Sequence, residues 1–183
     1  MKTLIILSHP NISKSVINKR LIEELKKYPE KYTIHELTYS YPDGKIDVEK
    51  EQELVEAHDN LILQFPIQWF SCPAILKAWL DDVLTHGWAY GRNGGDKLKG
   101  KKVALAVTAG IGQFDYQENG RYHYNLDQLL VPFETTFRYY CHADYRPFFA
   151  YYGAELVPGE EYSSTTTEIE KGAKDYLEFL ENM

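Results

Sequence analysis

The chain has 183 residues, of which 44% are hydrophobic, and this suits one compact domain spanning residues 1–183 with a full core. Its net charge is -7 and no run of Lys and Arg exceeds two residues, so we do not expect nucleic-acid binding. The two cysteines lie far apart and predict neither a disulfide framework nor a zinc ribbon, and no metal site is expected. No apolar segment approaches the length of a membrane span, so we expect a cytoplasmic protein.

An apolar run at residues 3–7 predicts the first strand, and a polar loop leads from it into a helix with one apolar face. Free N–H groups and the helix dipole at such a helix start favour an anion. Capping of the helix by Ser13 or Ser15 is the simpler interpretation of the same hydroxyl groups. Both interpretations stay open.

The next segments predict an edge strand and an exposed helix. Residues 32–37 alternate as a short strand, and Pro-Asp-Gly at 42–44 signals a turn. Residues 47–58 are strongly acidic, which is typical of a solvent-facing helix.

Residues 60–84 hold the most informative stretch. Residues 61–65 have the length and composition of a strand buried on both faces. Pro66 ends the pairing because it has no N–H, and an amphipathic helix follows Pro73. The short loop between them lies at the carboxyl end of a buried strand, where open α/β sheets bind small ligands.

Two interpretations of this loop stay open. In the first, Phe65, Trp69 and Phe70 belong to the core and Gln68 lies on the surface. In the second, the adjacent Trp and Phe form an apolar wall, and the Gln68 amide brings a donor and an acceptor to it. A planar heteroaromatic ligand needs both.

The second half of the chain continues the alternation. A Gly-rich loop occupies residues 86–95, and residues 102–108 form another buried strand with a sharp turn after it. A polar and aromatic loop reaches residue 124, and a helix follows that we expect Pro132 to bend. Residues 145–152 predict the last strand, and a capping box at 165–168 opens the final helix.

Five alternations of strand and helix without a linker or repeat predict an α/β protein. The expected architecture is a flavodoxin-like, doubly wound, five-stranded parallel sheet of order 2-1-3-4-5, with helices on both faces. That order brings loops 9–18, 66–71 and 108–123 to one edge of the sheet.

Four segments together are similar to a known family. They are Ser-His-Pro at 8–10 with Ser15 and Asn18, Gln-Phe-Pro-Ile-Gln-Trp-Phe at 64–70 with Pro-Ala-Ile-Leu-Lys at 73–77, Gly-Trp-Ala-Tyr-Gly at 87–91, and Thr-Ala-Gly at 108–110. They resemble the NAD(P)H:quinone oxidoreductase family of flavodoxin-like flavoproteins. The short bacterial branch with the ancillary oxidoreductases of glutathione-gated potassium efflux systems looks most similar, and the likeness runs from residue 1 to about 152.

The resemblance implies an enzyme that moves two electrons in a ping-pong reaction, as a hydride from NAD(P)H through a flavin to a quinone or similar acceptor. It implies a homodimer whose active site is completed across the interface. The chain lacks the long C-terminal extension of the animal enzymes, which bind FAD, so we expect FMN, with FAD as the alternative.

The resemblance also assigns site residues. The flavin phosphate and ribityl chain would bind at His9, Ser15, Ile17 and Asn18. The flavin ring would lie against Pro66, Ile67, Gln68, Trp69 and Phe70, with Thr108, Ala109, Gly110 and Ile111 on its other side. Tyr116 and His123 would be the catalytic residues at the reacting edge, and Trp88 and Tyr90 would come from the second chain.

The sequence departs from the family where Thr-Thr-Gly-Gly reads Thr-Ala-Gly-Ile at 108–111, and this change could alter flavin contacts or affinity. Two other functions stay open. A flavodoxin-type electron carrier is disfavoured, because residues 8–15 lack the Ser/Thr-x-Thr-Gly pattern of those carriers. A regulatory subunit of a membrane potassium efflux protein, held at the inner face of the membrane, is not separable from a free-standing reductase by sequence.

Overall fold

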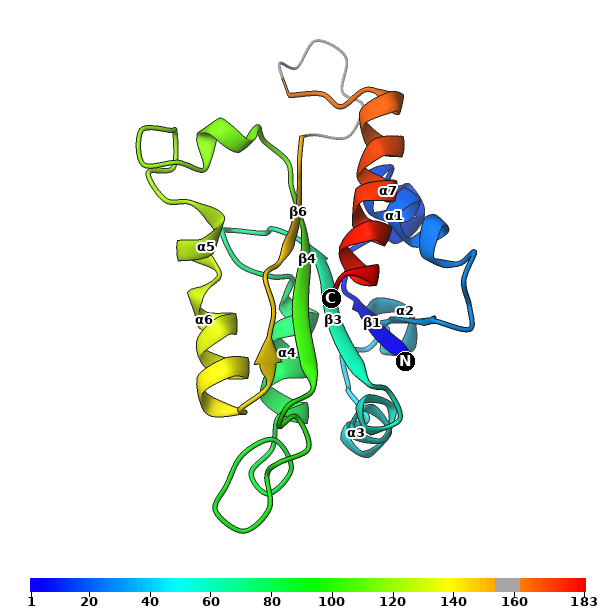
Figure 1. Ribbon diagram of the computed structural model, residues 1–183, viewed down its shortest axis with the longest axis vertical. Coiled ribbons are helices and arrows are strands. Elements are labelled where there is room, and N and C mark those ends of the chain that lie inside the picture. The colour runs from blue at the N-terminus through cyan, green and yellow to red at the C-terminus, as the bar shows by residue number, and fades with distance from the viewer. Residues whose placement is uncertain (154–161) are drawn as a thin grey trace.

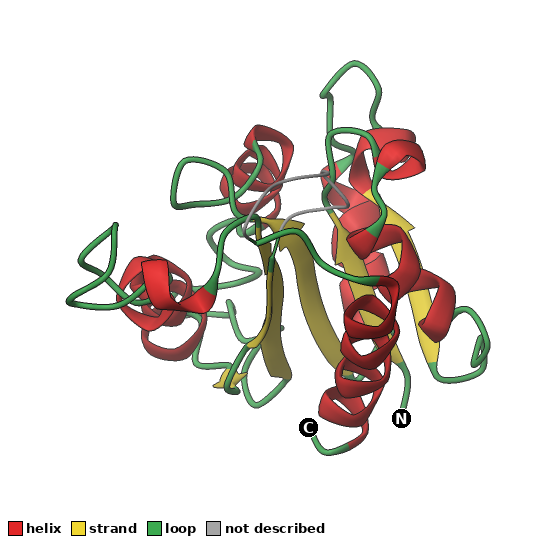
Figure 2. Ribbon diagram, turned by 90° about the horizontal axis from the view of Figure 1, so that it is seen from above, coloured by secondary structure: helices red, strands yellow, loops and turns green. Residues whose placement is uncertain are grey.

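The sheet has the predicted strand order. The computed structural model describes residues 1–153 and 162–183. Its parallel strands follow the order β2-β1-β3-β4-β5, and β6 also pairs with β4. Helices cover both faces of this sheet, as Figures 1 and 2 show. The flavodoxin-like prediction of order 2-1-3-4-5 is therefore confirmed.

The elements have the following bounds. The strands are β1 (Thr3–Leu7), β2 (Tyr32–Glu36), β3 (Asn60–Pro66), β4 (Lys102–Ala109), β5 (Asp144–Tyr145) and β6 (Phe149–Tyr152). The α-helices are α1 (Ile17–Leu25), α2 (Leu37–Ser40), α3 (Val48–Glu56), α4 (Ala74–Val83), α5 (Leu126–Leu129), α6 (Val131–Glu134) and α7 (Thr166–Glu181). Short helical turns are η1 (Ile12–Lys14), η2 (Gln113–Asp115) and the π-helical η3 (Thr135–Tyr140).

The central strands have no solvent-facing side. All five residues of β1 are buried, and β3 and β4 are buried over nearly their whole length. One face of the sheet packs against α1 and α7, and the other packs against α2 to α6. Continuous apolar strands need cover on both faces, which explains why their sequences do not alternate between apolar and polar residues.

Two predicted elements differ in detail. The strand expected at 145–152 is two short strands, β5 and β6, which pair with different parts of β4. Pro147 lies between them and has no N–H for a ladder. Pro132 does not bend a continuous helix either. It lies in the first turn of α6, where its missing N–H costs nothing.

The final helix begins where the capping box predicts. The Glu168 backbone N donates to Thr165 Oγ1 (3.2 Å), and the Thr165 backbone N donates to Glu168 Oε2 (2.7 Å). The capping box therefore satisfies two N–H groups at the start of α7.

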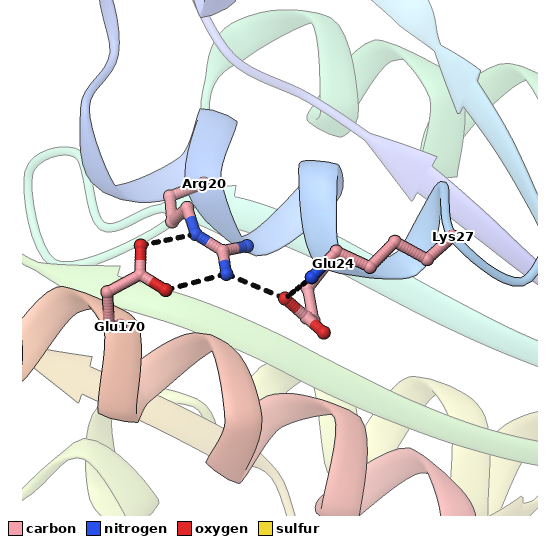
Figure 3. Close-up of polar contacts among 4 residues, drawn as sticks. All are labelled: Arg20, Glu24, Lys27 and Glu170. Atoms are coloured by element: carbon pink, nitrogen blue, oxygen red, sulfur yellow. Dashed lines mark hydrogen bonds and ion pairs between the residues drawn. The ribbon is translucent and has the colours of Figure 1, made fainter.

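An ion-pair network joins α1 to α7 (Figure 3). Arg20 donates through Nε and Nη2 to the two carboxylate oxygens of Glu170, at 2.7 and 2.8 Å. Nη2 also donates to Glu24, which accepts a further bond from Lys27. The hydrogen bonds from Lys27 and Arg20 hold the pKa of the Glu24 carboxyl below its usual range. The network fixes α1, whose first turn faces the carboxyl ends of the strands.

A buried carboxylate anchors α4 from the other face. Glu51 on α3 is fully buried and accepts hydrogen bonds from His35 Nε2 (2.7 Å), Tyr41 OH (2.6 Å) and Trp79 Nε1 (2.8 Å). Burial alone raises the pKa of Glu51, but the three hydrogen bonds outweigh it and the pKa lies below its ordinary value. Trp79 belongs to α4, so Glu51 fixes the helix that follows the loop at 67–73.

We predict that Glu51→Gln lowers the free energy of unfolding by about 3 kcal/mol, because the amide keeps one acceptor oxygen and turns its NH2 group toward a donor of the buried network. The folded-state pKa of Glu51 is depressed, so its contribution is complete above the unfolded pKa and is lost as pH falls through the folded value. The stability difference from wild type, measured by urea unfolding, should be constant at neutral pH and should shrink below about pH 4. Glu49→Gln, an exposed change on the same helix, is the control. An equal effect of both changes would contradict the assignment.

Candidate functional site

Three loops meet at one edge of the sheet. β1, β3 and β4 are parallel neighbours, so their carboxyl ends lie side by side. The loops that follow them contain the segments predicted at 9–18, 66–71 and 108–123. The structure therefore brings these three segments to a common edge, as the strand order predicts.

The first loop leads into the first turn of α1. The Asn18 backbone N donates to Ser15 Oγ at 3.1 Å, so Ser15 satisfies one N–H of this turn, as the capping interpretation expects, although the N-cap residue is Val16 and has no side-chain cap bond. His9 is held by two bonds, because its Nδ1 accepts from the Asn11 backbone N (3.0 Å) and its carbonyl accepts from Thr38 Oγ1 (3.0 Å). Ile17 is buried in the core beneath this turn. The first turn of α1 carries no acidic residue that would repel an anion.

The second loop is a tight turn with unusual residues. The backbones of Gln68 and Ser71 exchange hydrogen bonds of 3.0 and 2.9 Å across it. Trp69 and Phe70 are the two central residues, with φ of 47° and 61°. Two positive φ values are typical of a type I′ turn, which normally holds Asn and Gly. Each bulky residue in this conformation costs roughly 1–2 kcal/mol, and such strain clusters at functional sites.

The exposure of these aromatic side chains separates the two interpretations. Phe65 is fully buried, but Trp69 is 94% exposed and Phe70 is 39% exposed. The interpretation that places Trp69 and Phe70 in the core is therefore wrong. A large apolar surface held in a strained turn adds little stability to the folded chain, and the interpretation of this loop as a wall for a planar ligand stays a prediction.

Few backbone donors remain on this loop. The Ile67 N–H donates to the Thr108 carbonyl (2.8 Å), and the Gln68 N–H donates across the turn. Within residues 1–153 and 162–183, no backbone partner is seen for the N–H groups of Trp69 and Phe70. These two groups and the side-chain amide of Gln68 are what the loop can offer to the polar edge of a ligand.

The third loop begins with a mixture of buried and exposed positions. Thr108 is buried at the end of β4, Gly110 is exposed and Ile111 is half-buried. Ala109 is fully buried, and its carbonyl accepts from the Gly153 N–H at 2.9 Å. A hydroxyl group at position 109 would need a partner inside this apolar cluster, so the alanine there avoids an unpaired polar atom.

Tyr116 is held in an aromatic cluster. It is 6% exposed, its ring centroid lies 5.1 Å from that of Tyr122, and the Tyr122 ring makes an edge-to-face contact with Phe70 at 4.9 Å. Burial raises the pKa of Tyr116 to about 12. The phenol therefore stays protonated at physiological pH and can act as a donor. Tyr122 links the second and third loops and was not among the predicted residues.

His123 has a different environment. It is exposed, its backbone has φ of 60°, and its Nδ1 lies 3.2 Å from the Glu118 carbonyl oxygen. The strained backbone holds the imidazole outside the aromatic cluster, where it can meet solvent or a ligand. The structure places no contact between His123 and Tyr116.

A buried polar network connects all three loops. Gln64 Nε2 donates to Asn18 Oδ1 (3.3 Å), and Asn18 Nδ2 donates to Thr108 Oγ1 (2.9 Å). The Gln64 backbone carbonyl accepts from the Ser8 N–H at 2.9 Å. Gln64 was not predicted as a site residue, although it is the single polar side chain in the apolar run 61–65.

Two buried atoms at this edge lack a partner. In the described part of the chain, Ser8 Oγ and Gln64 Oε1 make no hydrogen bond. Leaving a buried polar group unpaired costs about 1–3 kcal/mol. Both atoms are covered by the protein itself, so the groups that a ligand can reach are those of the exposed loop. The exposed Trp69 and Phe70 rings suit a planar ring system, and the backbone N–H groups of this loop and the Gln68 amide supply donors beside it. This edge therefore fits a flavin mononucleotide. No group of three or more His, Cys, Asp or Glu side chains among residues 1–153 and 162–183 is placed to hold a metal ion.

Trp88 and Tyr90 lie away from this edge. Figure 1 shows their loop, between α4 and β4, at the opposite end of the sheet from the loop after β4. Trp88 is 7% exposed and its Nε1 donates to Glu56 (2.7 Å), so its side chain is packed within its own chain. Tyr90 packs on Tyr140 with a centroid distance of 4.8 Å and lines a cavity of about 330 Å³ between α4 and η3. That Trp88 and Tyr90 contribute to the active site of a second chain stays a prediction.

Comparisons with known proteins agree with this architecture. A family model described as "Flavodoxin-like fold" matches residues 1–179. A Bacillus subtilis protein named "uncharacterized NAD(P)H oxidoreductase YrkL" is 43% identical over 97% of this chain and 98% of its own length. The potassium-efflux ancillary protein KefF of an Enterobacter species is 41% identical over 80% of this chain and 81% of its own.

Two solved structures are also similar. General stress protein 14 of Treponema denticola, solved in complex with FMN, has a TM-score of 0.91 and 47% identity over 100% of this chain and 99% of that one. An NADPH-quinone reductase of P. pentosaceus has a TM-score of 0.85 and 27% identity over 100% of this chain and 99% of that one. Among the described residues, no helix combines the length and apolar character that crossing a membrane needs.

We predict that Trp69→Asn raises the free energy of unfolding by about 1 kcal/mol, because Asn tolerates the positive φ that strains Trp. Chemical denaturation measures this gain. Tyr39→Asn removes another exposed aromatic side chain from a residue without positive φ, and it should give no gain. A loss of stability in Trp69→Asn would show that the Trp side chain supports the fold, against the binding role.

Proposed function

The chain belongs to the flavodoxin-like fold family, and we propose that it is an FMN-dependent NAD(P)H oxidoreductase that reduces a quinone or similar acceptor. The strained turn that exposes Trp69 and Phe70 beside the buried phenol of Tyr116 carries this proposal. The names of YrkL and of the P. pentosaceus reductase support the reaction class. The FMN complex of the T. denticola protein supports FMN over FAD.

The residues that would hold FMN come from all three loops. His9, Ser15, Ile17 and Asn18 would surround the phosphate and ribityl chain at the start of α1, where N–H groups favour an anion. The ring would lie between the wall at 66–70 and residues 108–111. When bound, FMN would accept a hydride from NAD(P)H and pass two electrons to the acceptor.

Tyr116 and His123 would act on the acceptor. A quinone oxygen gains negative charge as it is reduced, and a donor aimed at it stabilises that charge. Tyr116 keeps its proton because burial raises its pKa to about 12. The exposed imidazole of His123 would exchange a proton with solvent. The aromatic wall would exclude water from the face on which NAD(P)H and the quinone bind in turn.

The order of binding gives the direct test of the function. If NAD(P)H and the quinone bind in turn to the same face of the flavin, the kinetics are ping-pong. Double-reciprocal plots of initial rate against NAD(P)H concentration, each at a fixed quinone concentration, should then be parallel lines. Converging lines would show that both substrates bind together and would contradict the shared face. No oxidation of NADH or NADPH by the FMN-loaded protein would instead favour the electron-carrier alternative.

We predict that Tyr116→Phe lowers kcat for quinone reduction roughly 100-fold, because it removes a donor to the developing anion and keeps the ring packing. His123→Ala should also lower kcat for quinone reduction. Stopped-flow rates of hydride transfer from NADPH, measured separately, should change little. Tyr124→Phe, an exposed tyrosine close by in the chain, is the control. Unchanged quinone reduction by both Tyr116→Phe and His123→Ala would remove these residues from the catalytic assignment.

We also propose that the protein acts as a homodimer. The loop between α4 and β4, which carries Trp88 and Tyr90, lies at the other end of the sheet from the loop after β4 (Figure 1), so these residues would contribute to the flavin site of a second chain. Sedimentation of the FMN-loaded protein tests this directly. A monomer with full activity would overturn the dimer.

A second candidate function is regulation of a potassium efflux protein, which the similarity to KefF supports. The regulatory function requires binding to a membrane protein, and the free-standing reductase does not. Co-purification of this chain with an efflux protein from detergent-solubilised membranes would support the regulatory role. Full NAD(P)H-quinone activity without retention on that partner would favour the free-standing reductase.

A further inference from the structure

Gln64 places an amide group in the middle of an apolar sheet. It lies on the central strand β3, is fully buried, and is paired in register with Leu7 of β1 and Ala106 of β4. Its neighbours along the strand, Leu63 and Phe65, are also fully buried. A polar side chain at such a position costs stability unless its hydrogen bonds serve a purpose.

The hydrogen bonds from Gln64 run in one direction. Gln64 Nε2 donates to Asn18 Oδ1, which leaves the amide nitrogen of Asn18 facing Thr108. Asn18 Nδ2 then donates to Thr108 Oγ1. Because the Thr108 oxygen accepts this bond, its hydroxyl proton is available to another acceptor. If the Gln64 amide were turned over, Asn18 would turn with it and the Thr108 proton would point back at Asn18.

The position of Thr108 decides what that proton can reach. Thr108 is the penultimate residue of β4, and its carbonyl accepts from the Ile67 N–H, so it lies against the loop that exposes Trp69 and Phe70. Asn18 lies in the first turn of α1 and contacts Thr108 through its side-chain amide. The Thr108 hydroxyl is thus the last member of the chain Gln64, Asn18 and Thr108, and it lies at the edge where the three loops meet.

We propose that Gln64 is a positioning residue for the cofactor. It holds the Asn18 amide in the orientation that makes Thr108 a hydrogen-bond donor to an acceptor atom of bound FMN. Gln64 itself touches no ligand in this arrangement. The inference rests on the proposed FMN function and adds to it a residue that acts through two others.

The test measures FMN affinity by quenching of flavin fluorescence, together with the melting temperature of the protein without FMN. Gln64→Met keeps the volume and removes the amide, and it should raise the Kd for FMN roughly tenfold, the effect of one lost hydrogen bond. Asn60→Leu is the matched control. Asn60 is also buried on β3 and donates to a threonine, Thr3, but at the other end of the strand. It should lower the melting temperature and leave the Kd unchanged.

A double-mutant cycle separates positioning from a general loss of stability. Thr108→Val should raise the Kd roughly tenfold in the wild type and should have almost no further effect in Gln64→Met. Thr108→Ser, which keeps the hydroxyl, should bind nearly as tightly as wild type. If Gln64→Met does not fold, Gln64→Leu provides the same cycle, since it also removes the amide and leaves an apolar side chain of similar size among the buried Leu63 and Phe65.

Two results would overturn the inference while FMN still binds to the wild type. One is an unchanged Kd in the Gln64 variant that folds. The other is a Thr108→Val effect that is as large in that variant as in the wild type. Failure of the wild type to bind FMN would overturn the proposed function, and this inference with it.

Discussion

The architecture depends on three parallel strands that are buried on both faces. β1, β3 and β4 expose no side to solvent, so polar side chains can meet a ligand only at the strand ends. Parallel pairing puts all three carboxyl ends at one edge. The loops that leave this edge can therefore act together, although about a hundred residues of sequence separate Ser8 from Thr108. Glu51 and the Arg20 network hold α4 and α1, the helices that two of these loops enter.

Three features of the same edge lower the stability of the folded protein. Trp69 and Phe70 occupy a turn that favours Asn and Gly, His123 also has a positive φ, and the Gln64 amide is buried with one oxygen unpaired. Each feature breaks a local rule. Exceptions also occur elsewhere among the described residues, because His142 has φ of 56° and the buried Arg20 Nη1 and Tyr176 OH have no hydrogen bond. Conflicts of this kind are expected where function, not folding, selects the residue. Of the four described non-glycine residues with positive φ, Trp69, Phe70 and His123 lie at this edge, which supports a ligand site there.

The sequence was sufficient for the fold because the signals were strong and local. The apolar runs at 3–7, 61–65 and 102–108 could only be buried strands, and the family-like segments identified the loops. Division of the last strand at Pro147 was missed, because the aromatic run on both sides of it suggested continuity. Exposure of the Trp69 side chain was not predictable, because the apolar residues around it fit a buried loop equally well. Only the backbone conformation of the turn decides between a buried and an exposed side chain. Tyr122 and Gln64 were missed for a different reason. Their roles depend on contacts with Phe70 and Asn18, which are far away in the sequence.

The central claim is that this edge binds FMN and carries electrons from NAD(P)H to a quinone. The visible spectrum of the FMN-reconstituted protein, followed without oxygen through addition of NADPH and then of a soluble quinone, tests it most directly. We expect the flavin absorbance to fall with NADPH and to return with the quinone. A protein that retains no flavin, or a flavin absorbance that NADPH does not change, would contradict the claim.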